Sequence, residues 1–414
     1  MKHFLHQLKF VKPKDILAIF TFLAALPVSW FYKRKRKNMW LVCERAAEAR
    51  DNGYWFYKYM REQHPEQDCV YAIKHQSPDY EKVAAINGEV IEFGSFRHWI
   101  YYLTAELNIS SQKEGKPNAA VCYLLEVYGI RKNKRVFLQH GIIKDDLKWL
   151  YYPVTKMWLF TTAANDEFSY CRQNFGYPES SIVQTGLCRF DNLDNISDGK
   201  TVFIMPSHRA WLSRPIKEYK KFDDAENFLQ TEFYQAWKNV LISDQFNQAI
   251  VNNDLKVVFF LHPNMQRYSD FFYGLSPNIR IMTTQDVDLQ EMLKKSVLLI
   301  SDYSSIFFDF AYMRKPLLYY QFDYEKFREG HYQEGYFSYE QDGFGPVCRN
   351  ADELVAEFCA IVEDGMKMPA KYTGRAESFF TYTDKKNCER TYHAILHRLK
   401  ESQSGIEQIA QKEA

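Results

Sequence analysis

Residues 297–311 read VLLISDYSSIFFDFA, and this stretch decides the fold. A short apolar run leads into a hydroxyl-rich turn and then into a second apolar run, which is typical of a buried strand followed by a helix. Ser304 and Ser305 are predicted at the start of that helix, where free backbone N–H groups and the helix dipole favour an anion. The same serines are also good helix caps. Phosphate binding and capping therefore both remain open from this stretch alone.

The alternation of strand and helix seen at 297–311 continues in both directions along the chain. Short apolar runs alternate with helical stretches, which predicts strands covered by helices on both faces of parallel sheets. In the first half the strands are predicted at 39–43, 69–73, 90–93, 107–110, 135–139, 157–161 and 182–185. In the second half they are predicted at 202–205, 256–261, 279–282, 297–300 and 317–322. The fold class is therefore α/β, with two doubly wound, Rossmann-like domains facing a cleft.

Four segments follow from this pattern. A polar, turn-rich break at 192–200 separates the two halves. We expect an N-terminal domain over 38–195 and a C-terminal domain over 196–400. Residues 1–37 are predicted to be a membrane-associating segment, and residues 401–414 a flexible tail.

The N-terminal segment contains the apolar run ILAIFTFLAALPVSWFY at 16–32, followed by KRKRK at 33–37. As a helix this run would be about 25 Å long, which is short for a hydrocarbon core of about 30 Å, and Pro27 would kink it. We expect a monotopic or re-entrant anchor on the cytoplasmic face of the membrane, with the basic run on anionic headgroups. A true span and a buried helix are the alternatives.

Composition excludes several classes of protein. The net charge is +1, which argues against nucleic-acid binding. The 8 cysteines are scattered without a C-x-x-C pair, so neither a zinc site nor a disulfide framework is indicated.

Phosphate-loop, dinucleotide-fold and H-E-x-x-H signatures are missing. Asp286-Val287-Asp288 lies at a predicted helix start, where acids need no metal. We expect no required cofactor and no metal site, although phosphoryl transfer is compatible with Mg²⁺.

Three histidines stand where predicted strands end. Gln139-His140-Gly141, Ser207-His208-Arg209 and His262-Pro263 each follow an apolar run. A side chain at the carboxyl end of a strand in a doubly wound domain points toward the ligand crevice. Histidine is suited to deprotonating a hydroxyl nucleophile near neutral pH. Arg209 and Arg328 are candidate cations for the phosphates of such a reaction, against the simpler interpretation of solvated surface residues.

At these residues the chain resembles the CDP-glycerol glycerophosphotransferase family, which makes teichoic-acid-type envelope polymers. The resemblance is carried across 135–350 by Gln139-His140-Gly141, by Pro206-Ser207-His208-Arg209, by His262-Pro263, by SDYSSIFFDFAYMRKPLLYYQFD at 301–323, and by Arg328-Glu329-Gly330 leading to Gly345-Pro346-Val347. The 301–323 stretch is the most specific of these. Relatives often continue His-Gly with Thr-Pro, where this chain has Ile142-Ile143.

The resemblance implies a glycosyltransferase-B-like fold and a transferase that moves glycerol-phosphate, or a related polyol-phosphate, from a CDP-polyol donor. The acceptor would be an undecaprenyl-linked or other lipid-linked molecule at the membrane surface, and CMP would be released. His140 is implied as the base on the acceptor hydroxyl, with His262 as a second catalytic group. Arg209, Ser304, Ser305, Asp309 and Arg328 would surround the donor phosphates, supported by Gly141, His208 and Asp302.

Two other functions fit the same fold. One is a conventional nucleotide-sugar glycosyltransferase, and the other is a non-catalytic, membrane-docked assembly protein. The catalytic interpretation expects the imidazole of His140 and the turn at Ser304 to face each other across a gap between the domains.

Overall fold

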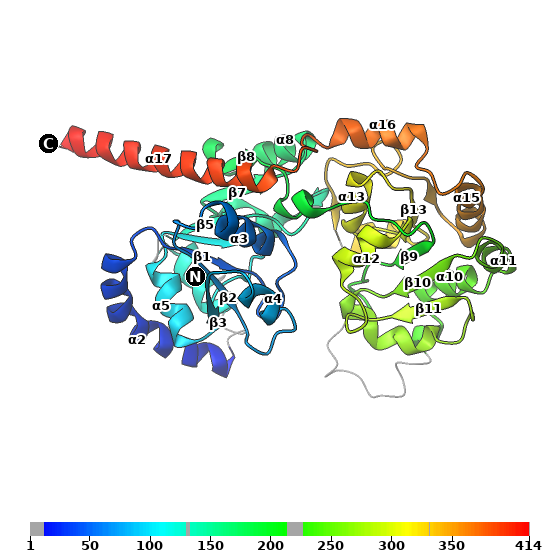
Figure 1. The fold of residues 1–414 in the computed structure, drawn as a ribbon, viewed down its shortest axis with the longest axis horizontal. Helices are drawn as coiled ribbons and strands as arrows, with labels where there is room; N and C mark the ends of the chain where they lie inside the picture. The colour runs from blue at the N-terminus through cyan, green and yellow to red at the C-terminus, as the bar shows by residue number, and fades with distance from the viewer. Residues whose placement is uncertain (1–11, 130–132, 213–226, 331, 414) are drawn as a thin grey trace. The chain divides into compact units, whose positions relative to one another are not determined.

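The computed structural model describes residues 12–129, 133–212, 227–330 and 332–413. The chain forms two compact units (Figure 1). Unit 1 comprises 1–142, 148–191 and 381–414, and unit 2 comprises 143–147 and 192–380. The predicted boundary at 195/196 therefore lies close to the observed one at 191/192. The predicted domains differ from the units in that 381–414 returns to unit 1 and 143–147 belongs to unit 2.

Unit 1 is built on a seven-stranded sheet of order β3-β2-β1-β4-β5-β7-β8, and every adjacent pair is parallel. The strands are β1 (Trp40–Cys43), β2 (Cys69–Ile73), β3 (Glu89–Glu92), β4 (Leu107–Ser110), β5 (Lys134–Phe137), β7 (Leu159–Thr162) and β8 (Ile182–Gln184). Helices include α3 (Asn52–Gln63), α4 (Tyr80–Ala84), α5 (Phe96–Thr104), α6 (Ala119–Val127), α7 (Tyr152–Thr155) and α8 (Asn165–Asn174). The central strands are buried along their whole length, as their continuous apolar runs predict.

Helix α17 (Asn387–Glu413) completes unit 1 from the far end of the chain (Figure 1). Its Cys388, Ile395 and Leu399 join the apolar core that contains Trp40 and Phe56. Residues 401–413, predicted as a flexible tail, continue this helix. The first part of α17, through Leu399, is therefore part of the first unit's core.

Unit 2 is built on a six-stranded parallel sheet of order β11-β10-β9-β12-β13-β15. The strands are β9 (Thr201–Met205), β10 (Lys256–Phe260), β11 (Ile279–Met282), β12 (Leu298–Ser301), β13 (Leu317–Tyr320) and β15 (Val347–Cys348). The α-helices are α10 (Glu232–Leu241), α11 (Asp244–Asn252), α12 (Leu289–Lys295), α13 (Ile306–Tyr312), α14 (Tyr324–Gly330), α15 (Ala351–Glu363) and α16 (Ala370–Phe379), with a 3₁₀ helix η5 at Pro263–Phe272. A core of Trp237, Phe259 and Tyr320 packs beneath them.

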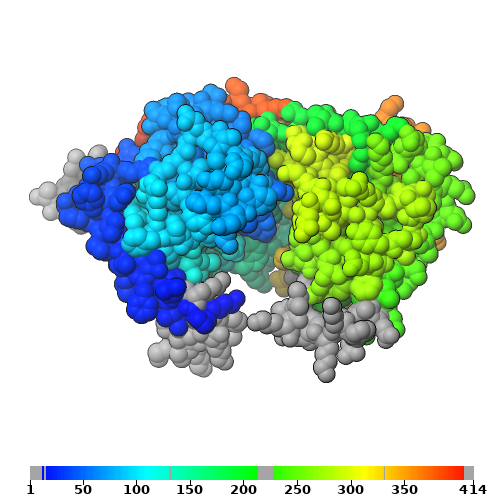
Figure 2. Space-filling model, turned by 60° about the horizontal axis from the view of Figure 1, so that its bottom comes forward, coloured from blue at the N-terminus to red at the C-terminus, as the bar shows by residue number. Residues whose placement is uncertain are grey.

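Helix α2 (Pro13–Lys35) runs along the surface of unit 1 against α5 (Figures 1 and 2). It continues through Pro27. Its inner face carries small residues such as Ala18 and Ala25, which are buried in the same apolar cluster as Trp99. The outer face carries Leu17, 67% exposed, and Phe20, 64% exposed, among other large apolar side chains. By length and composition α2 is a candidate membrane span, yet one of its faces is already occupied by protein.

Both ends of α2 are fastened to unit 1. Asn118 donates to Asp15 near its start at 2.8 Å. Arg36, directly after the helix, donates from Nε to Asp68 at 2.7 Å and from Nη1 to Glu89 at 2.8 Å. Helix α2 is therefore an integral rib of unit 1 as well as an apolar surface.

Candidate active site

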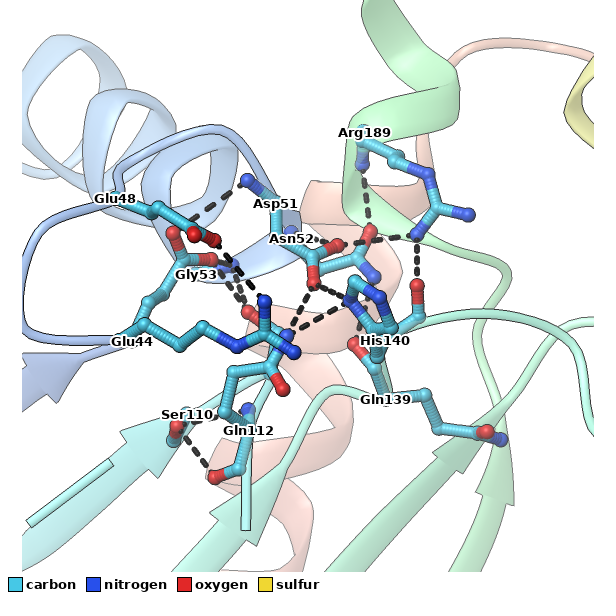
Figure 3. Close-up of polar contacts among 12 residues, drawn as sticks. Glu44, Glu48, Asp51, Asn52, Gly53, Ser110, Gln112, Gln139, His140 and Arg189 are labelled. Atoms are coloured by element: carbon cyan, nitrogen blue, oxygen red, sulfur yellow. Dashed lines mark hydrogen bonds and ion pairs between the residues drawn. The ribbon is translucent and has the colours of Figure 1, made fainter. Parts of the chain in front are cut away.

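The carboxyl edge of the unit 1 sheet gathers the polar residues of the first predicted site. Strand order reverses direction between β1 and β4, and in doubly wound sheets the ligand crevice lies at such a switch point. The loops after β1, β4 and β5 supply Glu44, Gln112 and His140, which meet at this edge (Figure 3).

The residue before His140 has a left-handed backbone conformation. Gln139, which precedes it, has φ of 63°, a conformation that costs a non-glycine residue on the order of 1 kcal/mol. The turn is held because Asn52 Nδ2 donates to the Gln139 carbonyl at 2.8 Å, while Gln139 Nε2 donates to the Thr161 carbonyl at 2.6 Å. The surrounding structure thus fixes the backbone on which His140 stands.

His140 is paired with a carboxylate, Asp51, that was not among the predicted site residues. Its Nδ1 lies 2.5 Å from Asp51 Oδ2. Because a carboxylate only accepts, this contact assigns the proton to Nδ1 and leaves Nε2 as the basic nitrogen of the neutral ring. The His140 side chain is 63% exposed, and among the described residues no hydrogen bond engages its Nε2. Asp51 therefore orients the imidazole through Nδ1, and the rest of the ring is accessible.

Two further side chains position Asp51. Gln112 Nε2 donates to Asp51 Oδ2 at 3.1 Å and lies 2.7 Å from His140 Nδ1. Arg189 Nη1 lies 3.1 Å from Asp51 Oδ1 and donates to the His140 carbonyl at 2.8 Å. Figure 3 shows Asp51, Gln112 and Arg189 converging on His140. Contacts from Gln112 and Arg189 therefore restrain the Asp51–His140 pair.

The electrostatics follow from this arrangement. The carboxylate of Asp51 raises the pKa of His140, while partial desolvation of the ring and the cations Arg189 and Arg45 work against that increase. Burial raises the pKa of Asp51, but the charges of His140 and Arg189 outweigh it and hold that pKa below its ordinary value. Asp51 therefore stays ionised, and it stabilises a positive charge on the imidazole.

Glu44 supports Asp51 from the start of α3. It is buried, and its Oε1 accepts from Gly53 N at 2.8 Å and Tyr54 N at 3.2 Å. Burial raises the pKa of Glu44 to about 7, and Asp51 adds to this. A Cβ at position 53 would lie 2.9 Å from Glu44 Cγ, so a larger residue there would displace the Glu44 side chain. In the sequence, residues 39–130 fit the family pattern only loosely, but Glu44 and Asp51-Asn52-Gly53 resemble its acceptor-side start, and this is the one signal for the cluster.

In unit 2 the loops after β9 and β10 bring two histidines together. The rings of His208 and His262 have centroids 4.8 Å apart. His262 precedes η5, and its Nδ1 accepts from Asn264 N at 3.2 Å. Burial lowers the pKa of His208, and Arg209 lowers it further. Both rings are half-buried at the carboxyl edge of the second sheet.

Arg209, which the resemblance places near the donor phosphates, is buried between two carboxylates in unit 2. Its side chain is 0% exposed, with Nε 2.7 Å from Asp323 Oδ2 and Nη1 2.9 Å from Asp302 Oδ2. Asp302 Oδ1 also accepts from Ser207 N at 2.8 Å. A guanidinium enclosed by two carboxylates has no surface to offer a donor phosphate in this conformation. Arg209 and Asp302 instead fix the loop that carries His208.

Arg328 and Asp309 are also not placed as free phosphate ligands. Arg328 has a side chain 11% exposed, and its Nη1 lies 2.6 Å from Asp145 Oδ1. Asp309 is buried within α13. The structure therefore gives Arg328 a carboxylate partner that the sequence did not predict.

Ser304 and Ser305 are half-buried and directly precede α13, the helix start at which they were predicted. Ser304 Oγ accepts from Ile306 N at the long distance of 3.5 Å. Ser305 is the residue before α13, and its side chain makes no cap hydrogen bond. The capping interpretation therefore explains Ser304 weakly and Ser305 not at all. Gly141, after His140, is half-buried at the corresponding edge of unit 1.

The described part of the chain offers no evident metal centre. Within it, no three His, Cys, Asp or Glu side chains form a group that could hold a metal ion. At the unit 1 edge, His140 and Asp51 are engaged with each other, and in unit 2 Asp302 and Asp323 are engaged with Arg209.

Comparisons with known proteins place these residues in a family context. The sequence profile of the CDP-Glycerol:Poly(glycerophosphate) glycerophosphotransferase family matches residues 24–397. The minor teichoic acid biosynthesis protein GgaB of Bacillus subtilis (strain 168) is 31% identical over 371 residues, which cover 87% of this chain and 40% of that protein. The teichoic acid poly(glycerol phosphate) polymerase of the same strain is 22% identical over 92% of this chain and 51% of its own length. The chain thus spans about half or less of these two relatives.

Solved structures match the fold. The wall teichoic acid polymerase TagF superposes with a TM-score of 0.66 at 15% identity, over 97% of this chain and 98% of that one. The UDP-GlcNAc 2-epimerase of Neisseria meningitidis, bound to UDP-GlcNAc, has a TM-score of 0.53 at 13% identity, over 87% of this chain and 100% of that one. The prediction of two Rossmann-like units of glycosyltransferase-B type is confirmed.

Proposed function

Because the chain belongs to the CDP-Glycerol:Poly(glycerophosphate) glycerophosphotransferase family, we propose that it transfers glycerol-phosphate, or a related polyol-phosphate, from a CDP-linked donor to a lipid-linked acceptor. The product would be a teichoic-acid-type or capsular envelope polymer. The observation that carries the proposal is the Asp51–His140 pair, in which Asp51 contacts Nδ1 and the His140 side chain is 63% exposed. An oriented imidazole of this kind is what a hydroxyl acceptor needs for attack at phosphorus.

The proposed reaction is an in-line displacement. Nε2 of His140 takes the proton of the acceptor hydroxyl, and the resulting oxygen attacks the phosphorus that bears the polyol. The bond from that phosphorus to the bridging oxygen breaks, and CMP leaves with the bridging oxygen. Asp51 stabilises the imidazolium that forms, as its negative charge already raises the pKa of His140. The His140 proton is then returned to solvent or to the leaving phosphate.

Unit 2 is proposed to hold the donor. The hydroxyls of Ser304 and Ser305 and the imidazoles of His208 and His262 are the half-buried polar groups at its carboxyl edge. Hydroxyl and imidazole groups can donate hydrogen bonds to the negative charge that develops on the phosphates during transfer. The reaction as written uses no metal held by the described residues; retained transfer after treatment with a chelator is the expected result.

Helix α2 is proposed to dock the protein on the cytoplasmic face of the membrane. Its outer face combines exposed Leu17, Phe20 and Trp30 with the basic residues that follow. Since the inner face is packed on α5, the helix suits an interfacial position better than a span. A lipid-linked acceptor would then be presented at the same surface.

A donor panel tests the proposed function. The protein is incubated with a lipid-linked acceptor and, separately, with CDP-glycerol, CDP-ribitol, a UDP-sugar and a CMP-sugar, and nucleotide release and product mass are measured. Release of CMP together with a polyol-phosphate mass increment is expected for a CDP-polyol. Consumption of a UDP-sugar alone would assign a glycosyltransferase instead, and no turnover with any donor would favour a non-catalytic assembly role.

A further inference from the structure

The residues directly after His140 form a short strap that belongs to unit 2. Residues 143–147 cluster with unit 2, whereas the chain on both sides clusters with unit 1. Within the strap, β6 (Asp145–Asp146) pairs antiparallel with β14 (Gln333–Glu334). Only residues 141–144 separate His140 from Asp145.

Buried charges clamp the strap. Asp145, 6% exposed, receives the Arg328 guanidinium at 2.6 Å and pairs with Lys144, which is itself buried. Separating the partners of a buried ion pair leaves each charge uncompensated, which is costly. The contacts between the strap and Arg328 are therefore expected to stay closed. Gly335 allows the close fit, because a Cβ there would collide with the backbone of Lys144 and Asp145.

The clamp lies within electrostatic reach of the SDYSS turn. Burial lowers the pKa of Lys144, while Asp145 and Asp302 act in the opposite direction. Asp302 is the residue that fixes the loop of His208 and Arg209. The strap is thus embedded in the same charged network as the proposed donor edge of unit 2.

On the other side of His140, the backbone is fastened to unit 1. Asn52 holds the Gln139 carbonyl, and Arg189 holds the carbonyl of His140 itself. His140 therefore stands between an anchor in unit 1 and an anchor in unit 2, joined by four residues of backbone. A loosened anchor on either side would let the imidazole drift from Asp51.

We propose that Arg328 and Asp145 are positioning residues for His140, acting through the strap, so that the integrity of unit 2 sets the alignment of the base in unit 1. The inference rests on the proposed function for its kinetic consequences, because these concern transfer. Its structural consequence, the alignment of His140 on Asp51, is measurable without any turnover.

The test compares Arg328→Met with wild-type protein. Misalignment of a catalytic group by about 1 Å costs on the order of 10²-fold, so kcat is expected to fall by about 10- to 100-fold while the KM for the donor changes less than about 3-fold. NMR titration of the His140 ring follows alignment directly. His140 is faced by Asp51, Arg189 and Arg45, all in unit 1, and none of them is altered in the variant. Its pKa is expected to fall toward the ordinary value as the Asp51 contact loosens.

Two variants and one control sharpen the test. Arg328→Lys keeps the charge and is expected to restore part of kcat, while Gly335→Ala disturbs the strap without removing a charge and is expected to reproduce the Arg328→Met titration shift. Lys315→Met removes another buried cation of unit 2, one that donates to backbone carbonyls near α12. It is expected to lower stability but to leave the His140 titration unchanged.

The possible outcomes are distinct. A folded Arg328→Met protein with the wild-type His140 titration and wild-type kcat overturns the strap inference and leaves the proposed function standing. A wild-type protein that transfers nothing overturns the proposed function, and the NMR titration then still decides the strap inference by itself.

Discussion

Asp51 Oδ2 lies 2.5 Å from His140 Nδ1, although the two residues are 89 positions apart in the chain. One comes from the start of α3 and the other from the loop after β5. Their pairing turns a histidine at a strand end into an oriented base. The proposed catalytic role of His140 depends on this contact.

Asp51→Asn should slow transfer by about 10²-fold, a typical contribution of acid–base catalysis. The amide does not hold the Nδ1–H tautomer, so less of the ring offers a basic Nε2. Since Asp51 raises the pKa of His140, and the neutral ring is the active base, activity rises with pH through that raised pKa. Loss of Asp51 should move the rising limb to lower pH.

The pH dependence of kcat/KM for Asp51→Asn measures this shift. Glu48→Gln is the matched control, because it removes an exposed carboxylate from the same loop, one that pairs with Arg45 at 3.4 Å. A rising limb at the same pH in Asp51→Asn and wild type would show that Asp51 does not set the base.

Ser304→Ala combined with Ser305→Ala should weaken binding of CDP-glycerol several-fold with little loss of stability. The stability is expected to hold because Ser305 makes no cap hydrogen bond and Ser304 makes a long one. Calorimetric titration of the donor, alongside thermal unfolding, measures both. Ser378→Ala, on α16, is the control. If donor affinity were unchanged and stability fell, the serines would be caps only.

Arg209→Met should destabilise the protein by about 3–5 kcal/mol, because it leaves Asp302 and Asp323 buried without their cation. Urea unfolding measures this loss. Arg349→Met removes a more exposed arginine paired with Glu340 and should cost about 1 kcal/mol or less. A stable Arg209→Met protein with lost donor affinity would return Arg209 to the phosphate-binding role first predicted for it.

Replacement of Leu17, Phe20 and Trp30 by serine should abolish binding to vesicles of phosphatidylglycerol and phosphatidylcholine without destabilising the fold, since these side chains are exposed. Deletion of residues 1–37 should, in contrast, destabilise unit 1, because α2 also covers Trp99 and its neighbours. The control replaces Ile242, Val251 and Tyr273, which are exposed in unit 2. Equal vesicle binding by the α2 and control variants would exclude α2 as the docking surface.

The sequence predicted the sheets well because their strands are apolar on both faces, and short apolar runs between helical stretches are typical of parallel sheets. It also placed His140, His208 and His262 at strand ends, since position along a strand is local information. The resemblance extended this to a fold that the superpositions confirm.

Long-range pairing was outside the reach of sequence patterns. Nothing local marks Asp51 as the partner of His140, or Asp302 and Asp323 as the partners of Arg209. The same holds for the return of α17 to unit 1 and for the strap at 143–147. From sequence alone, Arg209 is a reasonable candidate for a phosphate ligand, because its burial between two carboxylates cannot be seen there. That His140 and the Ser304 turn face a common gap stays a prediction.

Transfer by His140→Ala tests the central claim most directly. The His140 side chain is 63% exposed, so its truncation should leave the fold intact, and circular dichroism and CDP-glycerol binding check this. Polyol-phosphate transfer from labelled CDP-glycerol to a lipid-linked acceptor is then measured for variant and wild type. The account predicts a loss of about 10²- to 10⁴-fold with donor binding retained. Wild-type turnover by the folded variant would contradict it.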